Sequence, residues 1–366
     1  MNQKRIFCIL VLFITASLDI CLARYLEQHH GVLREKSQLQ NQEEAVAVLR
    51  AFELPREVYE ELTEGEETEE EAAAAEEKTD TEEKTDTEEK LSQSETDTES
   101  DAASTDEDES AAENRNADED ETAFENAESE MSEAAAENVL AYLFCRTTEK
   151  SVLKKWCRRE KEAEPKLFAG YVQAVQKILS DMVYFPVPES LNNARAGISY
   201  ENSWQSERTY GGVRGHEGCD IMAGTQIRGY YPVISVSDGV VEKTGWLPQG
   251  GYRIGIRSRC GVYFYYAHLA EYEEGLEEGM EIAAGQLLGY MGDTGYSEVE
   301  GTTGNFPVHL HFGVYLDDEK GSEVSFNPYY LLEILKERKL KYEYRAAAER
   351  SLHAGIKKMR TDIVKL

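Results

Sequence analysis

The chain has 366 residues, with 71 acidic and 39 basic side chains and a formal net charge of −32. Residues 63–133 hold 31 acidic and four basic side chains, a net charge of −27, which leaves the rest of the chain nearly balanced at −5. A nucleic-acid-binding protein would carry a clustered basic patch, and a polytopic membrane protein would carry several long apolar runs. The composition therefore argues against both classes.

The N-terminus has the pattern of an export signal. Lys4 and Arg5 precede thirteen uncharged, mostly apolar residues, from Ile6 to Leu18. That run is shorter than the roughly 20 apolar residues that a membrane-spanning helix needs. We expect residues 1–23 to be either a cleaved signal peptide or a retained membrane anchor, and both place the chain outside the cytoplasm.

Four cysteines remain beyond this segment, and they allow three disulfide pairings. Because an export signal implies an oxidising compartment, we expect disulfides. Pairing Cys145 with Cys157, and Cys219 with Cys260, keeps each bridge within one structural unit. The alternative is that all four of these cysteines remain thiols.

Three segments of different composition fill the N-terminal half. Residues 24–62 are amphipathic and predict a short helical stalk. Residues 63–133 form an acidic, low-complexity stretch with one aromatic residue, too little apolar surface to offset the entropy of ordering, so we expect a disordered linker. Apolar residues at helical spacing predict a helical segment over 134–190, which Pro186 and Pro188 end. A prodomain, a dimerisation element and a brace all remain open for it.

A β-rich pattern begins near residue 195. Apolar runs separated by glycines predict strands at 233–236, 239–241, 252–256, 262–266, 286–291 and 311–315. Since no helical pattern interrupts them, residues 195–330 predict an antiparallel all-β domain. We expect a helix from 329 to 339, where the C-terminal segment 331–366 begins. The tail of this segment is basic. It either contacts an anionic surface or the acidic linker, or stays solvated.

Four of the seven histidines fall in three short stretches of the β domain: His216-Glu217-Gly218-Cys219-Asp220, Ala267-His268-Leu269 and His309-Leu310-His311. Residues i and i+2 of a strand point to one face, so both histidines of the last stretch can enter one site. Imidazoles and a carboxylate suit Zn²⁺, and three protein ligands leave a fourth position for water. A structural zinc site would use four ligands, usually cysteines, and the sequence has no Cys-x-x-Cys pair. The pattern favours a catalytic metal site over isolated, packed histidines.

The region from about Tyr210 to Pro328 resembles the lysostaphin-type, or LytM-like, zinc endopeptidases, which cut peptides of bacterial peptidoglycan. The motifs follow the family order: His216-x-x-x-Asp220, Ser237-Asp238-Gly239, Tyr266-Ala267-His268, Gly285 to Gly295, and His309-x-His311. They cover about a third of the chain. The resemblance implies a small antiparallel β fold of the duplicated-hybrid-motif, or barrel-sandwich, kind.

The resemblance also implies the site. It makes His216, Asp220 and His311 the ligands of one zinc ion per chain, with His309 as general base and His268 as the group that stabilises the oxyanion. The implied substrate is peptidoglycan peptide, met at the cell wall or the membrane surface.

Two departures from the family pattern stand out. Residues 298–307 form a longer loop than usual, and Gly313 replaces an acidic residue that commonly follows His-x-His-Phe. Neither removes a ligand or a catalytic histidine. We therefore expect an exported zinc endopeptidase. The alternative is a non-catalytic member that binds peptidoglycan or activates a hydrolase, although such members typically lack zinc ligands. A third alternative is a phosphotransferase or biotinyl-like domain, but the sequence has no Met-Lys-Met attachment site.

Overall fold

The computed structural model describes residues 37–63, 131–318 and 320–351. The predicted export segment at 1–23, nearly all of the predicted linker and the end of the basic tail lie outside the described residues. Within the described ranges, no helix is both long and apolar enough to span a bilayer.

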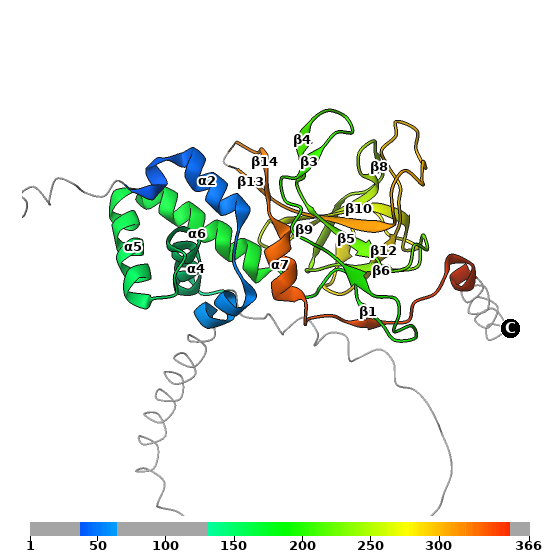
Figure 1. The fold of residues 1–366 in the computed structure, drawn as a ribbon, viewed down its shortest axis with the longest axis horizontal. Helices are drawn as coiled ribbons and strands as arrows, with labels where there is room; N and C mark the ends of the chain where they lie inside the picture. The colour runs from blue at the N-terminus through cyan, green and yellow to red at the C-terminus, as the bar shows by residue number, and fades with distance from the viewer. Residues whose placement is uncertain (1–36, 64–130, 319, 352–366) are drawn as a thin grey trace, which may run out of the picture.

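The helices gather in a unit beside the β domain (Figure 1). They are η1 (Gln38–Gln40), α2 (Gln42–Ala51), α4 (Glu133–Cys145), α5 (Lys150–Ala163) and α6 (Pro165–Ser180), and residues 56–63 are also helical. Ser132 caps α4 by accepting a hydrogen bond from the backbone of Ala135. Pro165 occupies the first turn of α6, where its missing N–H costs nothing. The apolar stripes predicted for this region are buried between α4, α5 and α6.

Residues 37–63, predicted as a stalk, pack along the helices and reach the β domain (Figure 1). Phe52 and Leu54 are fully buried. The backbone carbonyl of Arg50 accepts a hydrogen bond from Asn327, and its guanidinium donates to the carbonyl of Ser325. This segment therefore links the helical unit to the strand that ends at Phe326.

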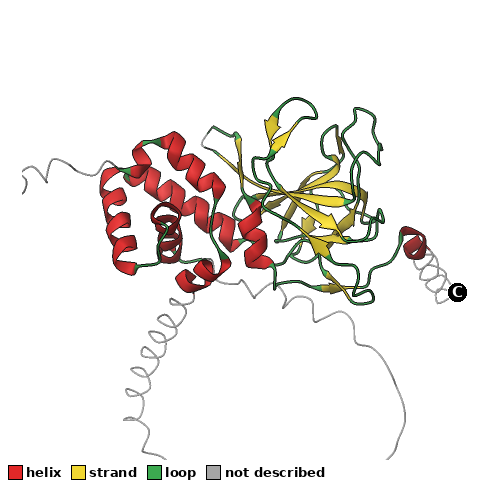
Figure 2. Cartoon of the chain, viewed as in Figure 1, coloured by secondary structure: helices red, strands yellow, loops and turns green. Residues whose placement is uncertain are grey.

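The β domain is one 11-stranded sheet with two short accessory pairs (Figure 2). The strands of the sheet are β2 (Ile198–Ser199), β5 (Cys219–Ala223), β6 (Pro232–Ile234), β7 (Gly239–Lys243), β8 (Trp246–Leu247), β9 (Gly251–Ser258), β10 (Tyr263–Tyr272), β11 (Glu281–Ile282), β12 (Leu287–Met291), β13 (His309–Asp317) and β14 (Glu323–Phe326). The path β11-β7-β9-β10-β13-β5-β2 is antiparallel throughout. The predicted fold class, an antiparallel β domain preceded by helices, is confirmed.

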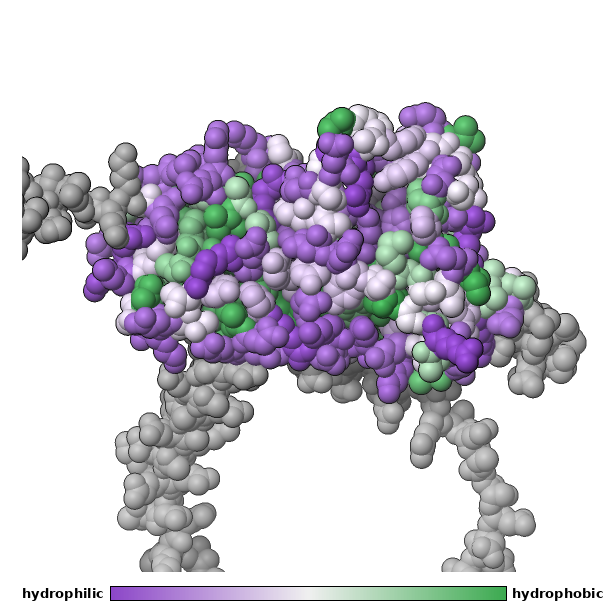
Figure 3. Space-filling model, viewed as in Figure 1, coloured by the Kyte–Doolittle hydropathy of each residue, from purple (hydrophilic) through white to green (hydrophobic). Residues whose placement is uncertain are grey.

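The remaining elements flank this sheet. They are the antiparallel pair β3 (Glu207–Arg208) and β4 (Arg214–Gly215), the parallel pair β1 (Glu189–Ser190) and β15 (Lys341–Tyr342), and helix α7 (Pro328–Leu335). Asn327 caps α7. The visible surface is mostly polar, with apolar patches over the helical unit and at two loop tips above the sheet (Figure 3).

The two predicted disulfides are wrong, since the four described cysteines are thiols. Cys219 lies on β5 and its thiol donates to the carbonyl of Glu201. Cys260 lies in the turn between β9 and β10, so β10 and β13 separate it from β5. The thiol of Cys157 donates to the carbonyl of Glu137 instead of bonding to Cys145. Burial raises the pKa of both Cys157 and Cys219 to about 12, which keeps these thiols protonated.

Candidate metal centre and catalytic cleft

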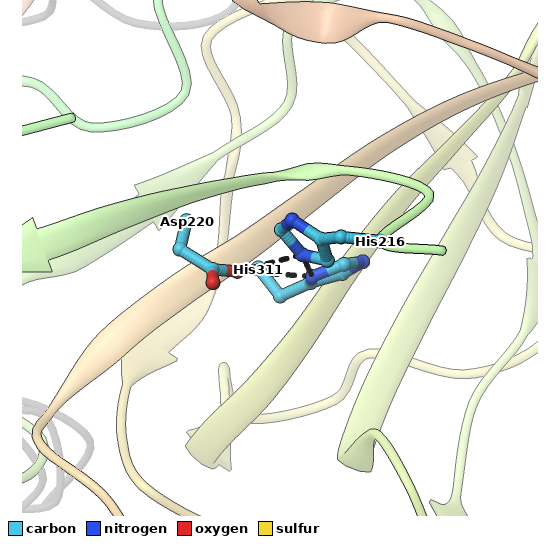
Figure 4. A group of neighbouring side chains, drawn as sticks. All are labelled: His216, Asp220 and His311. Carbon is cyan, nitrogen blue, oxygen red and sulfur yellow. Dashed lines mark hydrogen bonds and ion pairs between the residues drawn. The ribbon is translucent and has the colours of Figure 1, made fainter. Parts of the chain in front are cut away.

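Regular strand pairing brings two of the candidate ligands together. His311 on β13 lies directly opposite Asp220 on β5, and on its other side opposite Ala267 on β10. Side chains of directly opposed residues stand on the same face of a sheet. His216 lies in the turn just before β5 and folds back over the same face (Figure 4).

The donor atoms of these three side chains form a small triangle (Figure 4). The Nε2 atom of His216 lies 3.1 Å from Oδ1 of Asp220 and 2.9 Å from Nδ1 of His311, and that Nδ1 lies 3.1 Å from the same oxygen. Tetrahedral zinc with bonds of about 2.0 Å holds neighbouring donor atoms roughly 3.3 Å apart. The triangle thus matches one face of a zinc tetrahedron, and this group can hold a metal ion.

Neighbouring groups orient two of the three donors. The Nδ1 atom of His216 lies 3.2 Å from the carbonyl oxygen of Ser203, which can only accept, so Nδ1 carries the proton and Nε2 keeps its lone pair. Arg208 donates to Oδ2 of Asp220 at 2.7 Å, which leaves Oδ1 for the triangle. Outer partners of this kind raise metal affinity by fixing ligand orientation.

The pKa of Asp220 shows how strongly the site favours its charged form. Burial works to raise this pKa, but hydrogen bonds with His216 and His311 hold it well below its ordinary value. Burial lowers the pKa of His311. Asp220 thus presents a carboxylate and His311 a neutral imidazole, the protonation states that bind a metal ion.

Gly218 makes the turn between His216 and Asp220 possible. A Cβ atom at this position would lie 2.4 Å from Cε1 of His311 and 2.9 Å from the carbonyl oxygen of Phe312. No side chain fits there without displacing a ligand. The sequence motif contains this glycine, but its spacing alone does not reveal the contact.

His268 reaches the site through an irregularity in β10. Between Tyr266 and Leu269, β10 advances three residues while its partner β9 advances two, so one extra residue forms a bulge. His268 also has a φ of 63°, in the left-handed region that non-glycine residues rarely adopt. Its Nδ1 atom lies 2.7 Å from the carbonyl oxygen of Thr294.

His309 lies two residues before His311, and its ring faces the metal triangle. Its Nδ1 atom lies 2.7 Å from the carbonyl oxygen of Pro307, and its Nε2 atom lies 3.8 Å from Oδ1 of Asp220. The rings of His268 and His309 are 4.7 Å apart between centroids. Burial lowers the pKa of His268 well below its usual value, and the two neighbouring imidazoles of the cleft lower it further.

Phe306, in the loop at 298–307, packs against the rings of both His268 and His309. The loop that departs from the family pattern therefore places an apolar ring against His268 and His309.

A cleft of about 380 Å³ runs from the metal triangle across the sheet. Tyr263, Tyr265 and Tyr315 line it, and these were not singled out from the sequence. Gly313 accommodates them, since a Cβ atom there would lie 2.7 Å from the ring of Tyr315. The glycine that replaces an acidic residue in the family pattern thus makes room for a ring on the floor of the cleft. The ring of Tyr210 stacks on the ring of Tyr296 at the edge of the cleft, with 4.8 Å between centroids.

Comparisons with known proteins identify the family of this domain. Residues 214–325 match the model of peptidase family M23. A crystal structure of a lytM protein from Ruminococcus gnavus ATCC 29149, a candidate glycyl-glycine endopeptidase, is 47% identical with a TM-score of 0.51, over 58% of this chain and 84% of that one. The chain belongs to peptidase family M23.

Two curated relatives share the M23 domain. The L-Ala--D-Glu endopeptidase of Bacillus subtilis (strain 168) is 43% identical over 40% of this chain and 41% of its own length. The glycyl-glycine endopeptidase ALE-1 of Staphylococcus capitis is 32% identical over 31% of this chain and 30% of its own. The chain spans less than half the length of these relatives.

Proposed function

We propose that the M23 domain is a zinc endopeptidase that cleaves peptide bonds of bacterial peptidoglycan. The observation that carries this proposal is the donor triangle of His216, Asp220 and His311, with two further imidazoles facing the same cleft. Family membership supports the reaction class, and the geometry supports the metal.

The three donors fit one zinc ion per chain. Two imidazole nitrogens and one carboxylate oxygen are common zinc ligands, and a three-residue set leaves an open coordination position. Arg208 and Ser203 supply the outer contacts that such sites need. Zinc bound here would lower the pKa of a coordinated water and polarise the scissile carbonyl.

His309 serves as the general base in this proposal. Its Nδ1–H donates to the carbonyl of Pro307, so its Nε2 lone pair is directed toward the metal triangle. From there Nε2 can take a proton from the attacking water. Phe306 packs against the ring and holds its orientation.

His268 is assigned the stabilisation of the oxyanion. Its Nδ1–H donates to the carbonyl of Thr294, so Nε2 faces the cleft and donates only when the ring carries a second proton. Because burial lowers the pKa of His268, the ring is neutral before attack, and the proton it needs would be the one that His309 takes from the attacking water, since the two rings are neighbours. The bulge keeps the ring in this position, and backbone strain of this kind is common at functional sites.

The chain acts outside the cytoplasm in this proposal, because peptidoglycan lies there, either secreted to the wall or held at the membrane by its N-terminal segment. The two relatives are named for different bonds. Because this chain has the higher identity to the L-Ala--D-Glu endopeptidase, L-Ala–D-Glu is the first bond to test.

Digestion of purified peptidoglycan by the full chain tests this function. We expect new amino-terminal ends, abolished by a chelator and restored by added zinc. A protein that binds zinc but releases no peptide from peptidoglycan of any cross-link type would contradict the endopeptidase and favour a binding or activating role.

A further inference from the structure

Two arginines of the cleft have no acidic partner in the part of the chain that the structure describes. On the same face, Arg208 pairs with Asp220 at 2.7 Å, and Arg257 pairs with Glu242 and Asp317. Arg214 and Arg253, which line the cleft, form no such pair among the described residues. An arginine left without a carboxylate in a cleft is placed to receive one from a ligand.

Arg214 lies on β4, two residues before the ligand His216. Its Nε–H is buried and has no hydrogen-bond partner among the described residues. A buried donor without an acceptor is destabilising, and a ligand oxygen at this position would satisfy it. Arg214 lines the same cleft as the three residues of the triangle.

Arg253 approaches the same point from β9. Strand pairing sets Gly255 of β9 opposite Tyr265 of β10, so Arg253 stands two residues along on the face that Tyr265 occupies. Its guanidinium contacts the carbonyl of Thr244 through Nη1 alone. The remaining donors of the fork are available to a second acceptor.

Arg214, Arg253 and Tyr265 line the same cleft. Burial raises the pKa of Tyr265, and the positive charges of Arg253 and Arg214 both act to lower it. Both arginines therefore lie near one phenol, which burial keeps neutral and able to donate. Two cations and a neutral hydroxyl at one point suit a carboxylate.

Neither glutamate that lines the cleft forms an ion pair with Arg214 or Arg253, and Glu278, outside the lining, acts on Arg253 electrostatically without an ion-pair contact. Glu217 forms an ion pair with Arg50 at 3.0 Å. Glu323, on β14, acts electrostatically on Arg257 and on Tyr263, a tyrosine of the cleft on which Arg253 also acts. The positive end of the cleft thus lies beside the metal triangle, with acidic groups at its margins.

We propose that Arg214 and Arg253 form a carboxylate-binding subsite, which selects peptides with a free carboxylate beside the scissile bond. The proposal rests on the proposed endopeptidase function and narrows its substrate class. A glutamate linked through either of its two carboxyl groups keeps the other one free, so an L-Ala–D-Glu bond meets this requirement and a glycyl-glycine bond does not.

A matched pair of synthetic peptides tests the subsite. Both contain the L-Ala–D-Glu bond, and they differ only in whether the second glutamate carboxyl is free or a carboxamide. We expect the full-length, zinc-loaded protein to cleave the free acid at least about tenfold faster in kcat/KM, the loss typical of one charge-assisted hydrogen bond. Arg214→Gln and Arg253→Gln should each reduce cleavage of the free acid about tenfold and change cleavage of the amide less than about twofold.

Controls separate recognition from structure. Arg257→Gln removes a paired arginine on the same strand and should leave the preference unchanged. Arg214→Lys keeps the charge and should retain part of the preference. Equal cleavage of the two peptides by the unaltered protein, or equal loss of both in the Gln variants, would overturn the subsite.

Binding distinguishes this proposal from the endopeptidase itself. Calorimetry with the His309→Ala protein measures affinity for both peptides without turnover. If neither peptide is cleaved by the unaltered protein but the free acid binds more tightly through Arg214 and Arg253, the subsite stands and the proposed bond fails. If both are cleaved and bind equally well, the endopeptidase stands and the subsite fails.

Discussion

The metal triangle and the catalytic pair occupy one cleft but depend on different kinds of backbone. His311 and Asp220 are partners in an unbroken antiparallel register, and each projects as the regular strand alternation requires. The position of His268 depends on a bulge and a left-handed φ. His309 is the first residue of β13 and follows an irregular loop. The regular register supplies two of the three proposed ligands, and irregular backbone supplies His216 and the two residues proposed to move protons.

This difference has a physical reason. A zinc site needs fixed donors at short separations, which a paired register supplies without strain. Strand alternation alone would point His268 away from the face of the metal triangle. One extra residue in β10 turns the ring of His268 onto the face that Tyr265 and Ala267 already occupy.

The largest effect should come from breaking the triangle. His216→Ala removes one of three ligands and leaves an imidazole and a carboxylate that hold zinc poorly. We expect bound zinc to be lost on dialysis and peptidoglycan cleavage to fall by more than about a thousandfold. Metal analysis and release of new amino ends measure both. A variant that keeps its zinc would remove His216 from the ligand set.

A change in the catalytic pair should separate binding from turnover. His268→Ala is expected to retain zinc and to lower kcat by about 10² to 10⁴, the range for removing one catalytic proton donor or acceptor. KM should change little, because the ring acts on the transition state. Loss of zinc together with activity would show instead that the bulge supports the metal site.

Arg208 tests the outer contacts of the triangle. Arg208→Gln removes the charged donor to Oδ2 of Asp220 and should weaken zinc affinity by about 10 to 100-fold, with activity restored at high zinc. Competition with a fluorescent chelator measures the affinity. The control is Arg257→Gln, which breaks an ion pair on the same face and should not alter zinc binding.

The smallest predicted change concerns Gly218. Gly218→Ala places a methyl group against His311 and the carbonyl of Phe312, so we expect a loss of about 1 to 3 kcal/mol in unfolding free energy. Gly170→Ala in α6 is the matched control, because nothing lies within 4 Å of its Cβ position, and it should be neutral or stabilising. Equal denaturation midpoints for the two variants would contradict the close packing.

The regular elements could be predicted from the sequence. Alternation places His309 and His311 on one face, and the glycine-bounded apolar runs correspond to β6, β7, β9, β10, β12 and β13. The apolar stripes in the region of α4 and α6 are likewise buried. Each of these depends on local periodicity, which a single sequence carries.

Features that depend on distant contacts could not be predicted in this way. The bulge at His268 leaves no mark in the alternation of β10, whose residues are apolar on both faces. The packing of residues 37–63 depends on Arg50 meeting Ser325 across the chain. The disulfide prediction failed because an even count of cysteines says nothing about which strands separate them. The cleft floor of tyrosines needs Gly255 and Gly313, whose role only the packing reveals.

The central claim is that three of the five site residues hold zinc and two perform chemistry. It is tested most directly by measuring zinc content and peptide release for His309→Ala beside His311→Ala. The account predicts about one zinc per chain without cleavage for His309→Ala, and neither zinc nor cleavage for His311→Ala. Zinc retained by His311→Ala, or lost from His309→Ala, would contradict the assignment.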